Sequence, residues 1–203
     1  MRMPNKIKEY VGEYYIDEVK DYHVSGDSVF NICNKYILKI SNNIERLKRE
    51  YEKDKWFKNV LPVPTPIIFI VEDNTAYYLK EYIDGEVLCL EKYLNTPNTL
   101  IKLLKEALTM FHNVDVTNCP FIVGDGNTII HGDFCLPNIL VKDNRVVGFI
   151  DLEAAGVGDI WCDYAWCIWS LEYNTGTDKY TNQLLKELNI VFDQEKFLKY
   201  TCD

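Results

Sequence analysis

The sequence predicts an α+β fold in two lobes, a β-rich N-terminal lobe over residues 1–83 and a mainly helical lobe over residues 84–203. Three observations predict this division. Before residue 83, short segments rich in β-branched and aromatic residues alternate with polar turns. A single helical pattern, at 42–61, interrupts them. After residue 97 most apolar residues recur at helical spacing instead. The chain of 203 residues is long enough for one large domain or two small lobes.

The first lobe should contain a largely antiparallel sheet, because short connections separate its strand-like segments. In the helical pattern, Ile44, Leu47 and Tyr51 fall on one face. This helix must end before Pro62, since proline lacks a backbone donor and restricts the residue before it. We expect strands over 14–19, 28–33, 35–40, 67–72 and 76–83.

The second lobe should begin with a long helix whose apolar face is core. Thr96 and Pro97 are a typical cap and first helical residue, and leucines follow at helical spacing. A short strand at 128–130 then leads into the loop HGDFCLPN and a hairpin that turns at Asp143 and Asn144. We expect further helices near 160–171, 181–190 and 195–200.

Composition narrows the possible partners. The net charge of -9 disfavours nucleic acid, whose phosphates are bound by Lys and Arg. It suits a cationic partner, although acidic balance is more often a solubility property. Apolar runs are too short to span a bilayer, so no membrane contact is expected. The seven cysteines are odd in number and form no Cys-x-x-Cys pair, which indicates reduced thiols in a cytoplasmic protein. The oligomeric state stays open.

The loop HGDFCLPN carries the chemically most informative residues. Phosphoryl transfer needs an acid that orients the attacking hydroxyl and oxygen ligands for Mg²⁺. Kinases supply the acid and one ligand from an Asp and an Asn five residues apart, and a second ligand from a later Asp. Here Asp133 stands five residues before Asn138, and Asp151 ends the strand GFID.

The first lobe offers the cation that phosphoryl transfer also requires. Lys39 lies in an expected strand, and Glu50 lies eleven residues later in the expected helix, so the two can meet across the sheet face. An ordinary surface salt bridge is the alternative for this pair. Ser25 and Gly26, in HVSGDS, could lay backbone amides over phosphates or could simply form a hairpin turn.

The stretch HGDFCLPNILV…GFIDLEAAGVGD…DYAWCIWSL resembles the catalytic core of the aminoglycoside phosphotransferases, antibiotic kinases that share the protein-kinase fold. The upstream segments YILKIS, REYEKDKWFKNVLPVP and FHNVDVTNCPF also resemble this family, especially its 3′-phosphotransferase branch. The resemblance covers about residues 25–200. It implies a protein-kinase-like fold with an antiparallel N-terminal lobe that binds nucleotide and a helical C-terminal catalytic lobe.

The resemblance also implies a role for each matching residue. Asp133 would be the catalytic base, and Asn138 and Asp151 would bind Mg²⁺. Lys39 would contact the phosphates of ATP or GTP, and Glu50 would hold it in place.

Further roles follow from the same resemblance. Backbone groups of Glu81 and Ile83 would hydrogen-bond the purine, while Ser25 and Gly26 would belong to the phosphate-covering loop. Asp163 would brace the catalytic loop. His131 would also hold that loop and would not transfer protons.

Two features depart from the family pattern. Glu153 stands where the third position of D-x-G is usually glycine, and only residues 122–130 lie where the family usually has several dozen residues that help bind the drug. We expect an ATP- or GTP- and Mg²⁺-dependent transfer of the γ-phosphoryl group to a hydroxyl of a small molecule, an aminoglycoside by resemblance, and hence antibiotic resistance. The alternatives are a kinase of another amino-alcohol or a sugar, and a nucleotide-binding module with impaired catalysis. A protein kinase is disfavoured, because no A-P-E element follows Asp151.

Overall fold

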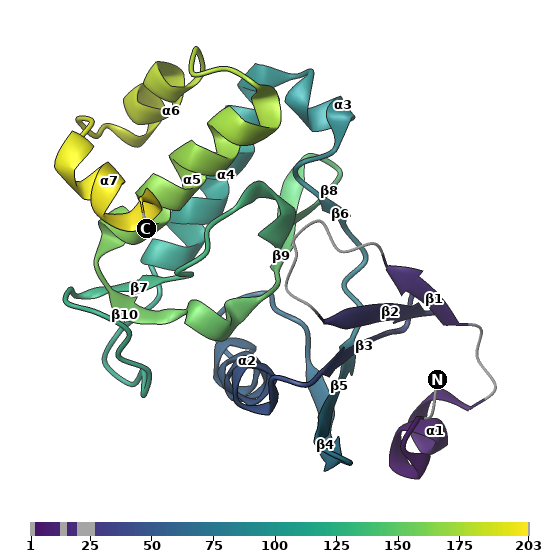
Figure 1. The fold of residues 1–203 in the computed structure, drawn as a ribbon. Helices are drawn as coiled ribbons and strands as arrows, with labels where there is room; N and C mark the ends of the chain where they lie inside the picture. The colour runs from purple at the N-terminus through teal and green to yellow at the C-terminus, as the bar shows by residue number, and fades with distance from the viewer. Residues whose placement is uncertain (1–2, 13–15, 20–26, 203) are drawn as a thin grey trace. The chain divides into compact units, whose positions relative to one another are not determined.

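A computed structural model describes residues 3–12, 16–19 and 27–202 of the chain. The chain divides into two compact units, Met1–Asp84 and Gly85–Asp203. Figure 1 shows that strands dominate the first unit and helices the second. The observed boundary lies one residue from the predicted one.

The N-terminal unit is built on a five-stranded sheet in the order β1-β2-β3-β5-β4. Every neighbouring pair is antiparallel, as the short connections predicted. The turn between the second and third strands places Cys33 and Asn34 at φ 53° and 52°. Ile32 pairs with Tyr36, so the turn spans Cys33 to Lys35, and β2 ends one residue earlier than expected. The strands are β1 (Ile16–Val19), β2 (Ser28–Ile32), β3 (Tyr36–Ser41), β4 (Pro66–Glu72) and β5 (Thr75–Glu81).

Two helices accompany this sheet. α1 (Asn5–Val11) was not predicted, because only Ile7 and Val11 mark its apolar face over seven residues. These two side chains are buried in a cluster with Leu38 of β3. α2 (Ile44–Phe57) packs against β4 and β5, and it ends four residues earlier than predicted.

The buried face of α2 differs in part from the expected one. Leu47 is fully buried, whereas Ile44 and Tyr51 are only half-buried. The same face also buries Glu50 and Asp54, two acids that lie one helical turn apart. Apolar periodicity therefore identified the helix but not the polar half of its packed surface.

The C-terminal unit is helical with two small sheets (Figure 1). Its longest helices are α4 (Pro97–His112) and α5 (Ile160–Thr175), and α4 begins at the predicted proline. The remaining helices are α3 (Glu91–Leu94), α6 (Thr181–Leu188) and α7 (Gln194–Thr201). One sheet has the order β6-β8-β9, formed by β6 (Glu86–Val87), β8 (Ile139–Lys142) and β9 (Arg145–Phe149). The other pairs β7 (Thr128–Ile130) with β10 (Gly156–Gly158).

The connection from α4 to β7 is short and contains no helix over residues 113–127. Ile122 forms an isolated parallel bridge with Val157 of β10, and Ile122 itself is exposed. Within residues 3–12, 16–19 and 27–202, no helix has the length and apolar character needed to cross a bilayer.

Candidate active site

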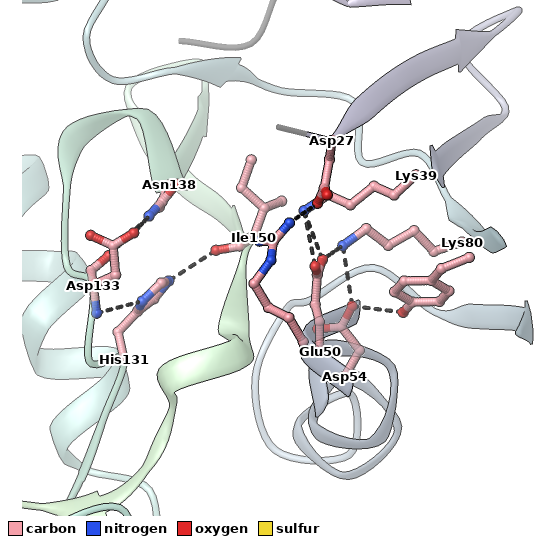
Figure 2. A network of polar contacts seen from close by, with 11 residues as sticks. Asp27, Lys39, Glu50, Asp54, Lys80, His131, Asp133, Asn138 and Ile150 are labelled. Carbon is pink, nitrogen blue, oxygen red and sulfur yellow. Dashed lines mark hydrogen bonds and ion pairs between the residues drawn. The ribbon is translucent and has the colours of Figure 1, made fainter. Parts of the chain in front are cut away.

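Asp133 and Asn138 meet in the C-terminal unit, where the loop after β7 runs into the short 3₁₀ helix Leu136–Asn138. The side-chain Nδ2 of Asn138 donates to the Asp133 carboxylate and to the Asp133 main-chain carbonyl, each at 2.9 Å. Figure 2 shows this contact beside His131. Because both partners are acceptors, the amide nitrogen must face Asp133, and the Asn138 carbonyl oxygen points away from it. The amide thus orients a half-buried carboxylate, while its own oxygen is directed away from that carboxylate.

The main chain links Asn138 to the segment that carries Asp151. The amide N–H of Ile150 donates to the carbonyl oxygen of Asn138 at 3.1 Å, and Asp151 is the next residue. Asp151 adopts the left-handed conformation, with φ 63° and ψ 51°. An amide oxygen and a carboxylate are hard oxygen ligands of the kind that Mg²⁺ accepts together with several waters. In the described ranges no group of three or more His, Cys, Asp or Glu side chains is arranged to hold a metal ion.

His131 is fully buried and has a fixed protonation pattern. Its Nδ1 accepts from the backbone N–H of Asp133 at 3.3 Å, and its Nε2 donates to the carbonyl oxygen of Ile150 at 2.9 Å. A ring that accepts at one nitrogen and donates at the other is neutral. His131 therefore joins the loop to the end of β9 and has no nitrogen left for proton transfer, which is the structural position that the resemblance implied.

Asp163 of α5 holds the start of the same loop. Its two carboxylate oxygens accept from the backbone N–H groups of His131 and Gly132, each at 2.9 Å, and it is fully buried. His112, the last residue of α4, contacts the same carboxylate at 3.0 Å. Gly132 has φ +81°, and a Cβ there would lie 2.7 Å from the Ala154 side chain. Only glycine lets the loop pass this close.

Cys135 lies inside the loop HGDFCLPN and is buried. Burial is the main cause that raises the pKa of its thiol, and the neighbouring Asp133 carboxylate raises it further. The thiolate, which is the nucleophilic form, is therefore suppressed at neutral pH. Cys135 is a packing residue.

In the N-terminal unit, Lys39 of β3 and Glu50 of α2 form the expected ion pair. The Lys39 Nζ lies 2.9 Å from Oε1 and 3.0 Å from Oε2 of Glu50. Only 8% of the Lys39 side chain and 2% of the Glu50 side chain are exposed. The alternative of an ordinary surface salt bridge is therefore wrong.

Three further polar residues, which the sequence reasoning missed, join this pair (Figure 2). Tyr78 of β5 pairs with Lys39 in the sheet register, so Tyr78 and Lys80 project from the same face as Lys39. The Lys80 Nζ lies 2.6 Å from Glu50 Oε1 and 3.2 Å from Asp54 Oδ2, and the Tyr78 hydroxyl donates to Asp54 Oδ2 at 2.7 Å. The sequence did contain a sign of this cluster. In YLK (78–80), Tyr78 and Lys80 alternate onto one face of a strand, and in EYEKD (50–54) the two acids at the ends are one helical turn apart.

Burial dominates the electrostatics of this cluster. It raises the pKa of Asp54 to about 6, against the opposing attraction of Lys80. Burial also raises the pKa of the Tyr78 hydroxyl well above its usual range, and the Asp54 carboxylate adds to this effect. The Tyr78 hydroxyl is therefore a permanent hydrogen-bond donor.

For the remaining predicted site residues, the structure gives either no description or no test of the predicted role. Ser25 and Gly26 lie outside the described residues, so their predicted role is untested; the adjacent Asp27 forms an ion pair with Arg46 of α2. Glu81 is the last residue of β5, and its N–H donates to the carbonyl oxygen of Thr65 at 2.9 Å. Ile83 is half-buried two residues later. Contact of Glu81 and Ile83 with a purine stays a prediction.

Glu153 can replace the usual glycine because the positive φ of this segment does not fall on Glu153. It sits in the 3₁₀ helix Leu152–Ala154, and the positive φ falls at Asp151. An acidic residue tolerates that conformation better than most, and no glycine is required at the third position.

Known proteins resemble the chain both in sequence and in fold. A model of the phosphotransferase enzyme family matches residues 125–198, which contain Asp133, Asn138 and Asp151. A probable aminoglycoside 3′-phosphotransferase of Lactococcus lactis is 29% identical over 192 residues, which cover 73% of each chain. An aminoglycoside 3′-phosphotransferase of Enterococcus faecalis is 26% identical over 98% of this chain and 96% of its own length. That alignment spans 257 residues against 203 here, so the Enterococcus protein carries residues that this chain lacks.

The solved structure of the aminoglycoside phosphotransferase APH(3″)-Id from Streptomyces rimosus superimposes with a TM-score of 0.80 at 18% identity. The match covers 96% of this chain and 93% of the Streptomyces chain. The predicted protein-kinase-like α+β fold is thereby confirmed. The chain is therefore similar in sequence to the phosphotransferase enzyme family over residues 125–198, and to aminoglycoside 3′-phosphotransferases over most of its length.

Proposed function

We propose that the protein transfers the γ-phosphoryl group of ATP or GTP to a hydroxyl group of an aminoglycoside. Asp133 accepts the hydroxyl proton as the acceptor oxygen attacks the γ-phosphorus. The bond from that phosphorus to the β–γ bridging oxygen breaks, and the nucleoside diphosphate leaves. The single observation that carries the proposal is the half-buried Asp133 carboxylate, oriented by the Asn138 amide on a loop that Asp163 braces.

The nucleotide is assigned to residues of the N-terminal unit. Lys39, held by Glu50, contacts the phosphates. Ser25 and Gly26, which lie outside the described residues, are assigned to the same phosphates by the resemblance. Backbone groups of Glu81 and Ile83 hydrogen-bond the purine. Support for a nucleotide comes from the solved Streptomyces relative in complex with ADP and streptomycin.

Mg²⁺ fits the donor set in the C-terminal unit. Asn138 would supply its carbonyl oxygen and Asp151 its carboxylate, since the Asn138 nitrogen is committed to Asp133. When bound, the ion supplies neutralisation of the charge on the transferring phosphoryl group. Asn138 has a second task that needs no metal, which is to hold the base in place.

A transfer assay tests the proposal directly. The purified protein is incubated with ATP or GTP, Mg²⁺ and one acceptor from a panel of aminoglycosides, other amino-alcohols and sugars, and the products are read by mass spectrometry. We expect one phosphate to be added to at least one aminoglycoside. Transfer only to another amino-alcohol or a sugar would replace the acceptor but keep the enzyme class. Tight nucleotide binding without any product would instead favour a binding module.

Asp133→Asn should lower the transfer rate by at least about a hundredfold, because general bases contribute that much or more. The matched control is Asp143→Asn, the same chemical change at an exposed turn residue with φ 51°, a conformation that Asn adopts readily. The control should retain wild-type turnover. Equal activity of wild type and Asp133→Asn would contradict the role of Asp133.

A further inference from the structure

Lys80 carries a contact that the proposed phosphate site does not account for. It is 1% exposed, and its ammonium group lies closer to Glu50 than Lys39 does, at 2.6 Å against 2.9 Å. Glu50 is thus shared by two lysines from neighbouring strands. A buried lysine is costly unless it is paired, so the position of Lys80 depends on its two carboxylate partners.

The geometry restrains Glu50 from two directions. Lys80 bridges Glu50 and Asp54, which lie on successive turns of α2, and so it ties that helix to β5. Tyr78 donates to the far carboxylate and limits how Asp54 can turn. Asp54 Oδ1 is buried with no hydrogen-bond partner, so the contacts that Asp54 makes with Tyr78 and Lys80 both run through Oδ2.

Removal of Lys80 would leave an unbalanced cluster. Glu50 would then lose one of its two lysine partners and keep Lys39, and Asp54 would lose the Lys80 ammonium. Two carboxylates one turn apart repel while both are charged, and this repulsion favours protonation of Asp54, so the hydrogen bonds around Glu50 would rearrange. Glu50 would shift, and the Lys39 ammonium would lose the contact that orients it.

We infer that Lys80 is a positioning residue of the phosphate site: from β5 it fixes Glu50 of α2, and through Glu50 it orients the Lys39 ammonium toward the nucleotide phosphates. The inference rests on the proposed function of Lys39. It assigns Lys80 no contact with the nucleotide, although Lys80 precedes the Glu81 backbone that is assigned to the purine. Loss of Lys80 should therefore weaken the binding of phosphates but not the binding of the purine, and this makes the inference testable.

The test compares a ligand that has phosphates with one that has none. Calorimetric titration with Mg–ATP and with adenosine is carried out on wild type and on Lys80→Met, which keeps the chain length and removes the charge. We expect the dissociation constant for Mg–ATP to rise about tenfold, the size typical of residues that act through another residue. Binding of adenosine should stay unchanged. Equal losses for both ligands, or no loss of Mg–ATP binding, would overturn the inference.

A second pair of variants separates positioning from general loosening of the unit. If Lys80 acts through Glu50, the double variant Glu50→Gln/Lys80→Met should bind Mg–ATP within about twofold of Glu50→Gln alone. Additive losses would contradict the inference. Lys80→Arg should recover part of the affinity, and Lys92→Met, which removes an exposed paired lysine, should match wild type.

Two results of the titration experiments would each require a different measurement. Should Lys80→Met fail to fold, Asp54→Asn replaces it; this change keeps an acceptor for Tyr78 but loosens Lys80, and a smaller, phosphate-dependent loss is expected. Should wild type bind no nucleotide, the proposed function has failed. The inference is then judged by acetylation of Lys39, read by peptide mass spectrometry. Faster acetylation in Lys80→Met supports it, and an unchanged rate overturns it.

Discussion

Asp54 is a carboxylate that the fold removes from water. It is fully buried, its pKa is raised to about 6 chiefly by burial, and one of its oxygens has no hydrogen-bond partner. A carboxyl whose pKa is higher in the folded than in the unfolded chain binds its proton more tightly when folded. Its stabilising contribution is complete below the unfolded value of 3.8 and is lost as the pH rises through about 6.

We therefore predict that the stability of the wild type relative to Asp54→Asn falls between pH 4 and pH 7. The decrease should be about 3 kcal/mol at most, since one pKa unit corresponds to about 1.4 kcal/mol. Urea unfolding of both proteins at several pH values measures the difference.

Tyr78→Phe gives a directional control for this prediction. The Tyr78 hydrogen bond lowers the pKa of Asp54, so its removal should move the pH midpoint of the stability loss upward. Parallel stability curves for wild type and Asp54→Asn would show that Asp54 does not titrate in this range.

At the scale of elements, α5 fixes the catalytic loop through one side chain. Asp163 accepts from two consecutive backbone N–H groups and contacts His112 at the end of α4. A helix, a second helix and a loop therefore converge on a buried carboxylate. If Asn replaced Asp163, its NH₂ group would lie against one of these two backbone N–H groups. Two donors would then face each other, and at least one would have no acceptor.

Asp163→Asn should lower the free energy of unfolding by about 2 kcal/mol, the usual cost of an unsatisfied buried hydrogen-bonding group. The amides of His131 and Gly132 should exchange hydrogen faster, and this local effect is measurable by mass spectrometry. The matched control, Asp159→Asn, lies at the N-cap of the same helix and contacts the Tyr200 hydroxyl. Because a hydroxyl can also accept, and Asn is as good a cap as Asp, this control should unfold like wild type. Equal exchange in the two variants would contradict the bracing role.

For the whole molecule, the net charge of -9 bears on the choice of acceptor. A field of this sign attracts cationic acceptors over distances of about 10 Å in dilute salt. We predict that the KM of a polycationic aminoglycoside rises several-fold between about 0.05 and 0.5 M KCl, because the Debye length shrinks over this range. Steady-state kinetics with an uncharged polyol acceptor serve as the control. An identical salt dependence for both acceptors would mean that the overall charge has no part in recognition.

The fold could be predicted where the apolar periodicity ran over many residues, or where proline and turn residues marked the ends of an element. The antiparallel strands, the proline that begins α4 and the helix α5 were all predicted from periodicity and turn residues. The helix α1 could not be, because a helix of seven residues with two buried side chains carries almost no periodic signal.

The site residues also fall into those that could be predicted from local sequence and those that could not. Asp133, Asn138 and Asp151 could be proposed from spacing because the loop and the hairpin are local, and Lys39 with Glu50 could be proposed because a strand and the next helix are neighbours. Lys80 could not, because its partners lie about thirty residues earlier in the chain. Alternation in β5 shows which face Lys80 occupies, but the packing of α2 on that face decides what it meets.

By itself, the sequence determined the fold class, the kinase-like order of its polar residues and the resemblance to a family of phosphotransferases, since these depend on local pattern and on motif spacing. Only the tertiary structure decided that Glu50 serves two lysines, that Asp54 is buried deeply enough to change its pKa, and that His131 is neutral. The reason is physical. Pairing, desolvation and tautomer depend on the atoms that surround a group, and those atoms come from segments that are distant in the chain.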